Sequence, residues 1–197
     1  MEQLQQTDSW FNDRLGKATA SKFSQVLAGG TGITREKYKA KVVAERLTNK
    51  KIDEYSSWQM AQGTEREALA RKLYEAITGN TVQEVGFIKI DNLEAGASPD
   101  GLVNEDGTVE IKSPELLAHM KILTTKQLPN EYKAQVQGQL WATNRKWCDF
   151  VSFNPDMNAK NRIIIIRVNR DEAYINMLKT EVTKFMQEVL EAVDKWQ

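Results

Sequence analysis

The sequence predicts an α/β protein in which helices flank a central mixed β-sheet. Residues 1–80 carry apolar residues at helical spacing, whereas residues 81–170 alternate short β-rich segments with turn residues and one helix. An amphipathic stretch closes the chain over residues 171–197. We therefore expect a single domain of 197 residues, with a helical N-terminal part, a sheet core and a C-terminal helix.

The composition indicates an ordinary globular domain, with 41% hydrophobic and 27% charged residues. The longest apolar run, the IIIIRV after Arg162, has the length of a strand, and the N-terminus lacks a basic-then-apolar signal pattern. The single cysteine, Cys148, excludes an internal disulfide and fits a reducing compartment. We expect a cytoplasmic protein with no membrane partner.

The formal net charge is zero, because 27 basic residues balance 27 acidic ones. Indiscriminate wrapping of nucleic acid needs a strong positive field, so this charge balance argues against it. A net charge of zero remains compatible with a local basic groove beside an acidic centre.

Two helices are expected before residue 50. The first occupies TASKFSQVLAGG, with Thr19 or Ser21 as its N-cap and Gly29-Gly30 as its end. The second occupies TREKYKAKVVAERLT, with Thr34 as its N-cap. A third, longer helix follows YSS and ends at Gly79-Asn80. We expect its buried face to carry Leu69, Leu73 and Ile77.

The sequence pattern changes after residue 80 from helical spacing to short β-rich segments. TVQEVGFIKI, AGASPDGLV and GTVEIKS predict strands, and Asp106-Gly107 predicts a hairpin. NEYKAQVQGQLWAT predicts a helix capped by Asn130, followed by strands in KWCDFVSFN and NRIIIIRVN. The buried face expected for the terminal helix consists of Tyr174, Leu178, Val182, Phe185, Val189 and Val193.

One hairpin, SPDGLVNEDGTVEIKSPE at residues 98–115, gathers charges among strand residues. Alternation puts Glu110 and Lys112 on one strand face, and Val109 and Ile111 on the other, toward the core. The turn folds the second strand back on the first and brings Asp100 near Glu110. Two carboxylates and one ammonium can therefore meet at the sheet edge.

Such a trio suits a magnesium site on a phosphate substrate. Mg²⁺ takes one or two carboxylates together with waters and phosphate oxygens, and it lowers the pKa of a bound water. A lysine can orient or help deprotonate that water, or stabilise the developing charge. Glu-x-Lys alone is weak evidence, since a second copy at Glu131–Lys133 lies in a predicted helix, where i and i+2 do not share a face. The local pattern leaves solvated surface charges as an equally good explanation.

Four segments occur in this order along the chain: RLGKATASKF, GTEREALARKLYEAITG, ASPDGL with VEIKSP, and YKAQVQGQLWAT. Together they resemble the phage lambda exonuclease family of viral recombination nucleases. This family belongs to the PD-(D/E)xK nuclease superfamily. The resemblance runs from about Trp10 to Pro155. It implies a restriction-endonuclease-like core.

The resemblance also implies an active site. Asp100, Glu110 and Lys112 match the catalytic residues of the family. The metal ligands would be the side chains of Glu67, Asp100 and Glu110 together with the backbone carbonyl of Ile111. The implied cofactor is Mg²⁺, with one or two ions per site and Mn²⁺ able to substitute.

Four residues would bind DNA. Gln135 matches a glutamine near the active site of the family, and Tyr132 lies one helical turn earlier on the same side. Both could instead belong to the edge of the core. Arg14 and Ser21 match residues that take the 5′-phosphate of the cut strand.

Several of these matches have simpler alternatives. Glu67 could be a solvated helix charge, with Glu65 as the substitute ligand. Ser21 could act only as a helix N-cap, and Arg14 could be an idle surface arginine. His119 has no partner pattern, so we expect a loop or helix-surface residue.

The function implied by the resemblance is Mg²⁺-dependent 5′→3′ digestion of double-stranded DNA ends. The products would be 3′ single strands for annealing-type recombination. The implied partners are 5′-phosphorylated duplex ends, two further copies in a homotrimeric ring, and a single-strand annealing protein. The setting would be a bacterial cytoplasm and a phage or prophage gene. A sequence- or structure-specific endonuclease, a repair nuclease or a non-catalytic DNA-binding relative remain alternatives.

Overall fold

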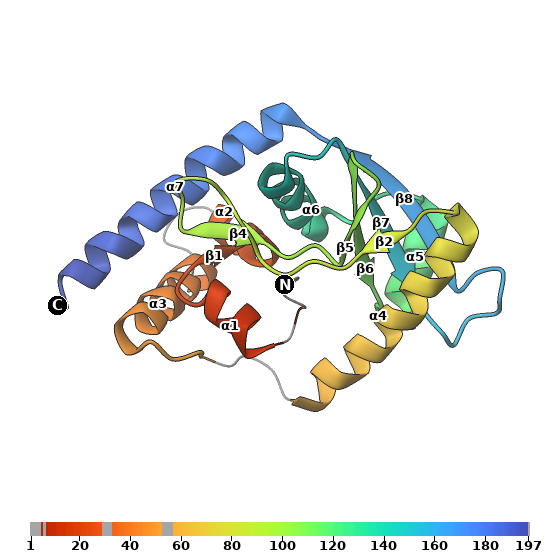
Figure 1. Ribbon diagram of the computed structural model, residues 1–197, viewed down its shortest axis with the longest axis horizontal. Coiled ribbons are helices and arrows are strands. Elements are labelled where there is room, and N and C mark those ends of the chain that lie inside the picture. The colour runs from red at the N-terminus through yellow and green to blue at the C-terminus, as the bar shows by residue number, and fades with distance from the viewer. Residues whose placement is uncertain (1–4, 6, 29–32, 53–56, 197) are drawn as a thin grey trace.

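A five-stranded mixed sheet forms the centre of the protein (Figure 1). The computed structural model describes residues 5, 7–28, 33–52 and 57–196, with only the backbone of residues 57–64. The strand order is β2-β5-β6-β7-β8, and β6 and β7 run parallel while the other pairs are antiparallel. The strands are β2 (Val82–Gln83), β5 (Gly101–Val103), β6 (Gly107–Lys112), β7 (Trp147–Phe153) and β8 (Ile163–Asn169). The predicted fold class is confirmed.

A second, smaller sheet holds the N-terminal segment against the rest of the chain. Its order is β1-β4-β3, formed by β1 (Ala18–Thr19), β4 (Ala95–Ala97) and β3 (Ile88–Lys89). β1 lies parallel to β4, with Ala18 opposite Ala95. Ala18 and Thr19, far from the charged hairpin in sequence, are thereby fixed beside β4, the strand that leads into that hairpin.

Helices cover both faces of the large sheet. On one face, α4 (Ser57–Thr78) packs Ala70 and Tyr74 against Val109 and Ile111 of β6. On the other face lie α5 (Leu116–Thr125) and α6 (Asn130–Thr143), whose buried residues contact Phe150 of β7. Val109 and Ile111 therefore point into the core as predicted.

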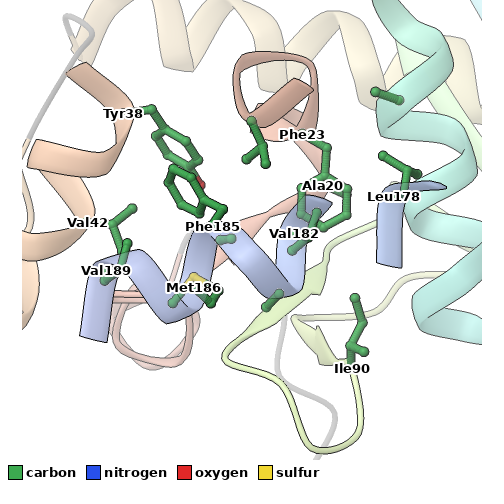
Figure 2. Close-up of a cluster of buried hydrophobic side chains, with 14 of the residues drawn as sticks. Ala20, Phe23, Tyr38, Val42, Ile90, Leu178, Val182, Phe185, Met186 and Val189 are labelled. Atoms are coloured by element: carbon green, nitrogen blue, oxygen red, sulfur yellow. The ribbon is translucent and has the colours of Figure 1, made fainter. Parts of the chain in front are cut away.

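The remaining helices form a lobe around the terminal helix α7 (Glu172–Asp194), which lies along one side of the molecule (Figure 1). This lobe contains α1 (Asp8–Arg14), the 3₁₀-helix η1 (Ala20–Lys22), α2 (Phe23–Leu27) and α3 (Ile33–Thr48). Figure 2 shows Phe23, Tyr38 and Val42 packed with Phe185 and Val189 of α7. The predicted face of α7 is confirmed: five members are buried and Tyr174 is partly buried, namely Tyr174, Leu178, Val182, Phe185, Val189 and Val193.

The first predicted helix is wrong in its bounds. Thr19 lies in β1, and Ser21 lies inside η1, which gives way to the short α2. Neither side chain caps a helix here, because the N-cap of η1 has no side-chain hydrogen bond. Gly29-Gly30, the predicted end, lies outside the described residues. Thr34 is also not a cap, since α3 already includes Ile33.

The buried face of α4 also differs from the prediction. Of the three predicted residues, Leu73 packs against the core, whereas Leu69 is 51% exposed and Ile77 is 56% exposed. Ala70 and Tyr74 are fully buried instead. The small Ala70 lets the helix approach the sheet, and the hydroxyl of Tyr74 donates a 2.8 Å hydrogen bond to buried Asp149. The buried face of this helix therefore combines apolar packing with a polar bond to the sheet, which hydropathy does not detect.

Two further predictions, for Asn130 and for His119, are wrong; both residues lie in the helices on the α5–α6 face of the large sheet. Asn130 is the first residue of α6, and Pro129 occupies the N-cap. Helix α5 was not predicted, and its His119 is fully buried, so the expected loop or surface position is wrong. The ring nitrogens of His119 lie 2.8 Å from Ser152 Oγ and 2.8 Å from the carbonyl oxygen of Asn161. These polar partners explain how a histidine is buried here.

Candidate active site

The predicted charged hairpin forms, and one hydrogen bond ties its two strands together at the charged end. β5 and β6 pair antiparallel, with Gly101 opposite Val109. Asp100 immediately precedes β5, and its Oδ2 accepts a 2.6 Å hydrogen bond from the backbone N–H of Ile111. The carboxylate of Asp100 is thereby held beside the strand that carries Glu110 and Lys112.

Glu110 and Lys112 lie together as alternation predicts. The Nζ of Lys112 is in direct contact with Oε1 of Glu110. Glu110 is only 1% exposed, whereas the Lys112 side chain keeps 29% of its surface. A buried, paired carboxylate is not a solvated surface charge, so that alternative is excluded for Glu110.

Two glutamines of α6 fix the carboxylate of Glu110. The side-chain amide of Gln135 donates to Oε1 at 2.5 Å, and that of Gln139 donates to Oε2. Gln137 points elsewhere and donates to the carbonyl of Asn169 at 2.9 Å. The sequence reasoning identified Gln135 and missed Gln139. Its signal was available, because residues four apart share a helix face.

Glu67 approaches the same site from α4. Arg71, one helical turn later, donates to Oε1 of Glu67 at 2.6 Å and also lies 2.7 Å from Oε1 of Glu84. Burial raises the pKa of Glu67, Arg71 opposes this, and repulsion from Glu110 adds to it. Glu65 is exposed. The structure therefore brings Glu67, rather than Glu65, into the field of the hairpin carboxylates.

Charges in the site act strongly on one another. Burial raises the pKa of Asp100 well above its ordinary value, and repulsion from Glu110 and Glu67 raises it further. Burial lowers the pKa of Lys112, but attraction to Glu110 and Asp100 outweighs burial and leaves that pKa raised. Lys112 is thus held as a charged hydrogen-bond donor.

The donor set suits a hard divalent cation. The carboxylates of partly buried Glu67, partly buried Asp100 and buried Glu110 repel one another, and a bound cation would relieve this repulsion. Within the described ranges, no three acidic, histidine or cysteine side chains already converge on one point. Loading a metal therefore calls for side-chain rearrangement, beginning with the contact between Lys112 and Glu110.

A cavity of about 420 Å³ connects this site to the N-terminal lobe. All four residues predicted to bind DNA line it, together with the predicted catalytic lysine. These are Arg14, Ser21, Lys112, Tyr132 and Gln135. The structure thus brings together two groups of residues that the sequence separates by about ninety positions.

The far end of this cavity is basic. The guanidinium of Arg14 lies 4.0 Å from the ring centroid of Trp10, and burial lowers its pKa to about 10, an effect that Tyr38 and Glu45 oppose. Arg14 therefore remains charged at neutral pH. Four lysines not singled out from the sequence also line the cavity: Lys17, Lys22, Lys41 and Lys51. Lys17 and Lys22 lie in the same RLGKATASKF segment as Arg14 and Ser21, whereas Lys41 and Lys51 come from segments with no local pattern that indicates them.

No helix in the described part of the chain is long and apolar enough to cross a membrane.

Comparisons with known proteins agree on one family. The YqaJ-like viral recombinase domain matches residues 9–146. The alkaline exonuclease LHK-Exo from Laribacter hongkongensis has a similar structure, with a TM-score of 0.90 and 37% identity over 96% of both chains. LHK-Exo in complex with dAMP matches with a TM-score of 0.91 and 38% identity, again over 96% of both chains. A comparison with curated proteins gives no match.

A more distant structure shares the fold. A phage-related exonuclease from Haemophilus somnus 129PT is 13% identical, with a TM-score of 0.75 over 95% of this chain and 100% of that one. The family model and the similarity to LHK-Exo confirm the resemblance drawn from the charged hairpin and its neighbouring segments. The chain belongs to the YqaJ-like viral recombinase family.

Proposed function

We propose that the protein is a metal-dependent 5′→3′ exonuclease that digests double-stranded DNA from its ends. One observation carries the proposal: a single cavity is lined by Arg14 and Ser21 and also by Lys112, which contacts buried Glu110. A nuclease that cuts at a strand end needs both a phosphate anchor and a hydrolytic centre at fixed separation. The similarity to the alkaline exonuclease LHK-Exo supports this activity.

We assign the hydrolytic centre to the charged hairpin because its oxygen ligands suit a hard divalent cation. The side chains of Glu67, Asp100 and Glu110, with the carbonyl of Ile111, would hold Mg²⁺, and Mn²⁺ would substitute. A bound Mg²⁺ would supply charge neutralisation and an activated water. Gln135 and Gln139 orient Glu110, and charged Lys112 donates to the water or to the phosphate oxygen on which charge develops.

The phosphate anchor would set the polarity. Arg14 offers a planar guanidinium suited to a phosphate dianion, and the exposed Ser21 offers a hydroxyl. Hydrolysis that leaves a 5′-phosphate on the next nucleotide regenerates the group that this end binds. The related LHK-Exo has been crystallised with dAMP, a deoxynucleoside monophosphate, which is the class of product that DNA exonucleases release.

We extend the proposal to assembly and partners. A ring of three copies around the duplex would let a chain of zero net charge retain DNA with few phosphate contacts. A single-strand annealing protein would take up the exposed 3′ strands. Both statements rest on the family resemblance.

The test uses duplex DNA labelled at its 5′ or 3′ end beside a covalently closed circle, each with Mg²⁺ and with chelator. The proposal predicts Mg²⁺-dependent early release of the 5′ label as a mononucleotide, and an intact circle. Cleavage of the circle would indicate an endonuclease. Early release of the 3′ label would reverse the polarity, and absence of cleavage in Mg²⁺ or Mn²⁺ would indicate a DNA-binding relative.

A further inference from the structure

Helix α3 forms the back wall of the cavity. Tyr38, Lys41 and Glu45, spaced three and four residues apart on one face, line the cavity. The helix also packs against α7, where the ring of Tyr38 stacks on Phe185 with centroids 5.3 Å apart (Figure 2). The helix therefore offers a firm support for the segment in front of it.

Helix α3 holds that segment at three backbone groups. Glu45 Oε2 accepts a 3.2 Å hydrogen bond from the N–H of Gly16, and the Nε of Arg46 donates to the carbonyl of Gly16 at 2.7 Å. The hydroxyl of Tyr38 accepts a 3.0 Å bond from the N–H of Thr19. Both polar backbone groups of Gly16 are thus bound by neighbouring residues of one helix.

Gly16 suits this arrangement in two ways. Its φ of +65° lies in the left-handed region, which glycine adopts without strain. A Cβ at this position would lie 2.6 Å from Cγ of Arg46. The turn at Gly16 comes two residues after Arg14, which ends α1. The position of this turn therefore affects where the guanidinium of Arg14 lies.

Glu45 is the one acidic residue among the described residues that line the cavity. The basic residues that line it are Arg14, Lys17, Lys22, Lys41, Lys51 and Lys112. A carboxylate in an anion-binding cavity weakens anion binding by repulsion, so its presence needs another explanation. Its contacts give one: Oε2 binds Gly16, and Oε1 accepts a 3.4 Å bond from the N–H of Ile52 and lies 3.8 Å from Nζ of Lys41.

We propose that Glu45 and Arg46 are positioning residues that clamp Gly16 and thereby hold Arg14 where it can meet a terminal phosphate. The proposal rests on the proposed 5′-phosphate anchor. The two residues touch no reacting atom. Their effect on end recognition passes through the backbone of the turn between α1 and β1.

The test measures KM and kcat on blunt duplexes that differ only in a 5′-phosphate or a 5′-hydroxyl. Glu45→Ala should raise KM for phosphorylated ends about tenfold, the effect of losing a hydrogen bond to a charged group, and should change KM for hydroxyl ends much less. Glu45→Gln should retain most of the preference, because its amide oxygen still accepts from Gly16. Glu36→Ala, an exposed change on the same helix, is the matched control.

Arg46→Ala provides a second route if Glu45→Ala does not fold, because it removes the bond to the carbonyl of Gly16. Wild-type preference in both variants would overturn the inference alone. Tighter phosphate-end binding in both Glu45→Ala and Glu45→Gln would also overturn it, since Glu45 would then act only as a repelling charge. Wild-type protein without a preference, or Arg14→Ala with the full preference, would overturn the proposed anchor and the inference together.

Discussion

Oδ2 of Asp100 accepts a 2.6 Å hydrogen bond from the backbone N–H of Ile111. This bond holds a carboxylate in a partly buried position where Glu110 and Glu67 repel it. Repulsion between carboxylates is common in metal sites and destabilises the folded protein while the metal is absent. We therefore expect that removing the charge of Asp100 increases stability and abolishes activity.

Asp100→Asn should abolish cleavage and raise the melting temperature in chelator. Below about pH 4, aspartate is protonated in the unfolded chain as well as in the folded one, so its charge costs nothing. As the pH rises from about 4, where unfolded aspartate ionises, toward the raised folded pKa of Asp100, the wild type loses stability and the variant does not; above that folded pKa the difference stays constant. The gain in melting temperature should therefore be larger at pH 8 than at pH 5.

Thermal unfolding of both proteins at the two pH values measures this gain. Mg²⁺ should then stabilise the wild type more than the variant, because a bound cation relieves the repulsion. A variant less stable than the wild type at pH 8 would show that the hydrogen bond outweighs the repulsion, contrary to our account.

Glu67→Gln should weaken metal binding, since it removes one of three carboxylates. The readout is calorimetric titration with Mn²⁺ in the absence of DNA, supported by the Mg²⁺ dependence of the rate. Glu65→Gln is the matched control, because Glu65 is exposed and lies two residues away on the same helix. An equal loss of Mn²⁺ affinity in both variants would show that α4 attracts the cation by its overall negative charge and that Glu67 is not a specific ligand.

Gln139→Met should lower kcat about tenfold while leaving KM for DNA unchanged. Gln139 is buried and orients Glu110, but it does not line the cavity. Gln135→Met should change both constants, because Gln135 binds Glu110 and also faces the cavity. Steady-state kinetics on a 5′-phosphorylated duplex separates the two. If Gln139→Met keeps the wild-type kcat, Gln139 does not orient Glu110 for catalysis.

Ca²⁺ in place of Mg²⁺ should support DNA binding but little turnover. Its coordination is looser and more variable than the octahedral shell of Mg²⁺, so a reacting water is held less well. Binding measured by fluorescence anisotropy and digestion measured on gels would give the two values under one set of conditions. Full-rate digestion with Ca²⁺ would contradict a site built for Mg²⁺.

Much of the site could be predicted because its signals are local. The Asp106-Gly107 turn and strand alternation together predict that Glu110 and Lys112 share a face beside Asp100, and they do. The terminal helix was equally predictable, since its apolar spacing covers six positions of one face.

The rest depends on contacts between distant segments. Tyr74 of α4 bonds to Asp149, 75 residues later, and hydropathy alone did not indicate that Ala70 and Tyr74 are the fully buried residues of this helix. Glu45 meets Gly16 across 29 residues, and a glutamate on an amphipathic helix gives no sign of such a contact. His119 is buried because Ser152 and Asn161 satisfy its ring nitrogens.

The most direct measurement is single-turnover digestion of a 5′-phosphorylated duplex by Lys112→Ala beside the wild type. DNA binding by both proteins is measured in Ca²⁺. Lys112 contacts Glu110 at the junction of the cavity and the carboxylates, so its loss should cost about 10²–10³-fold in the cleavage rate. DNA affinity should remain close to that of the wild type. Wild-type cleavage by the variant would contradict the assignment of this hairpin as the hydrolytic centre.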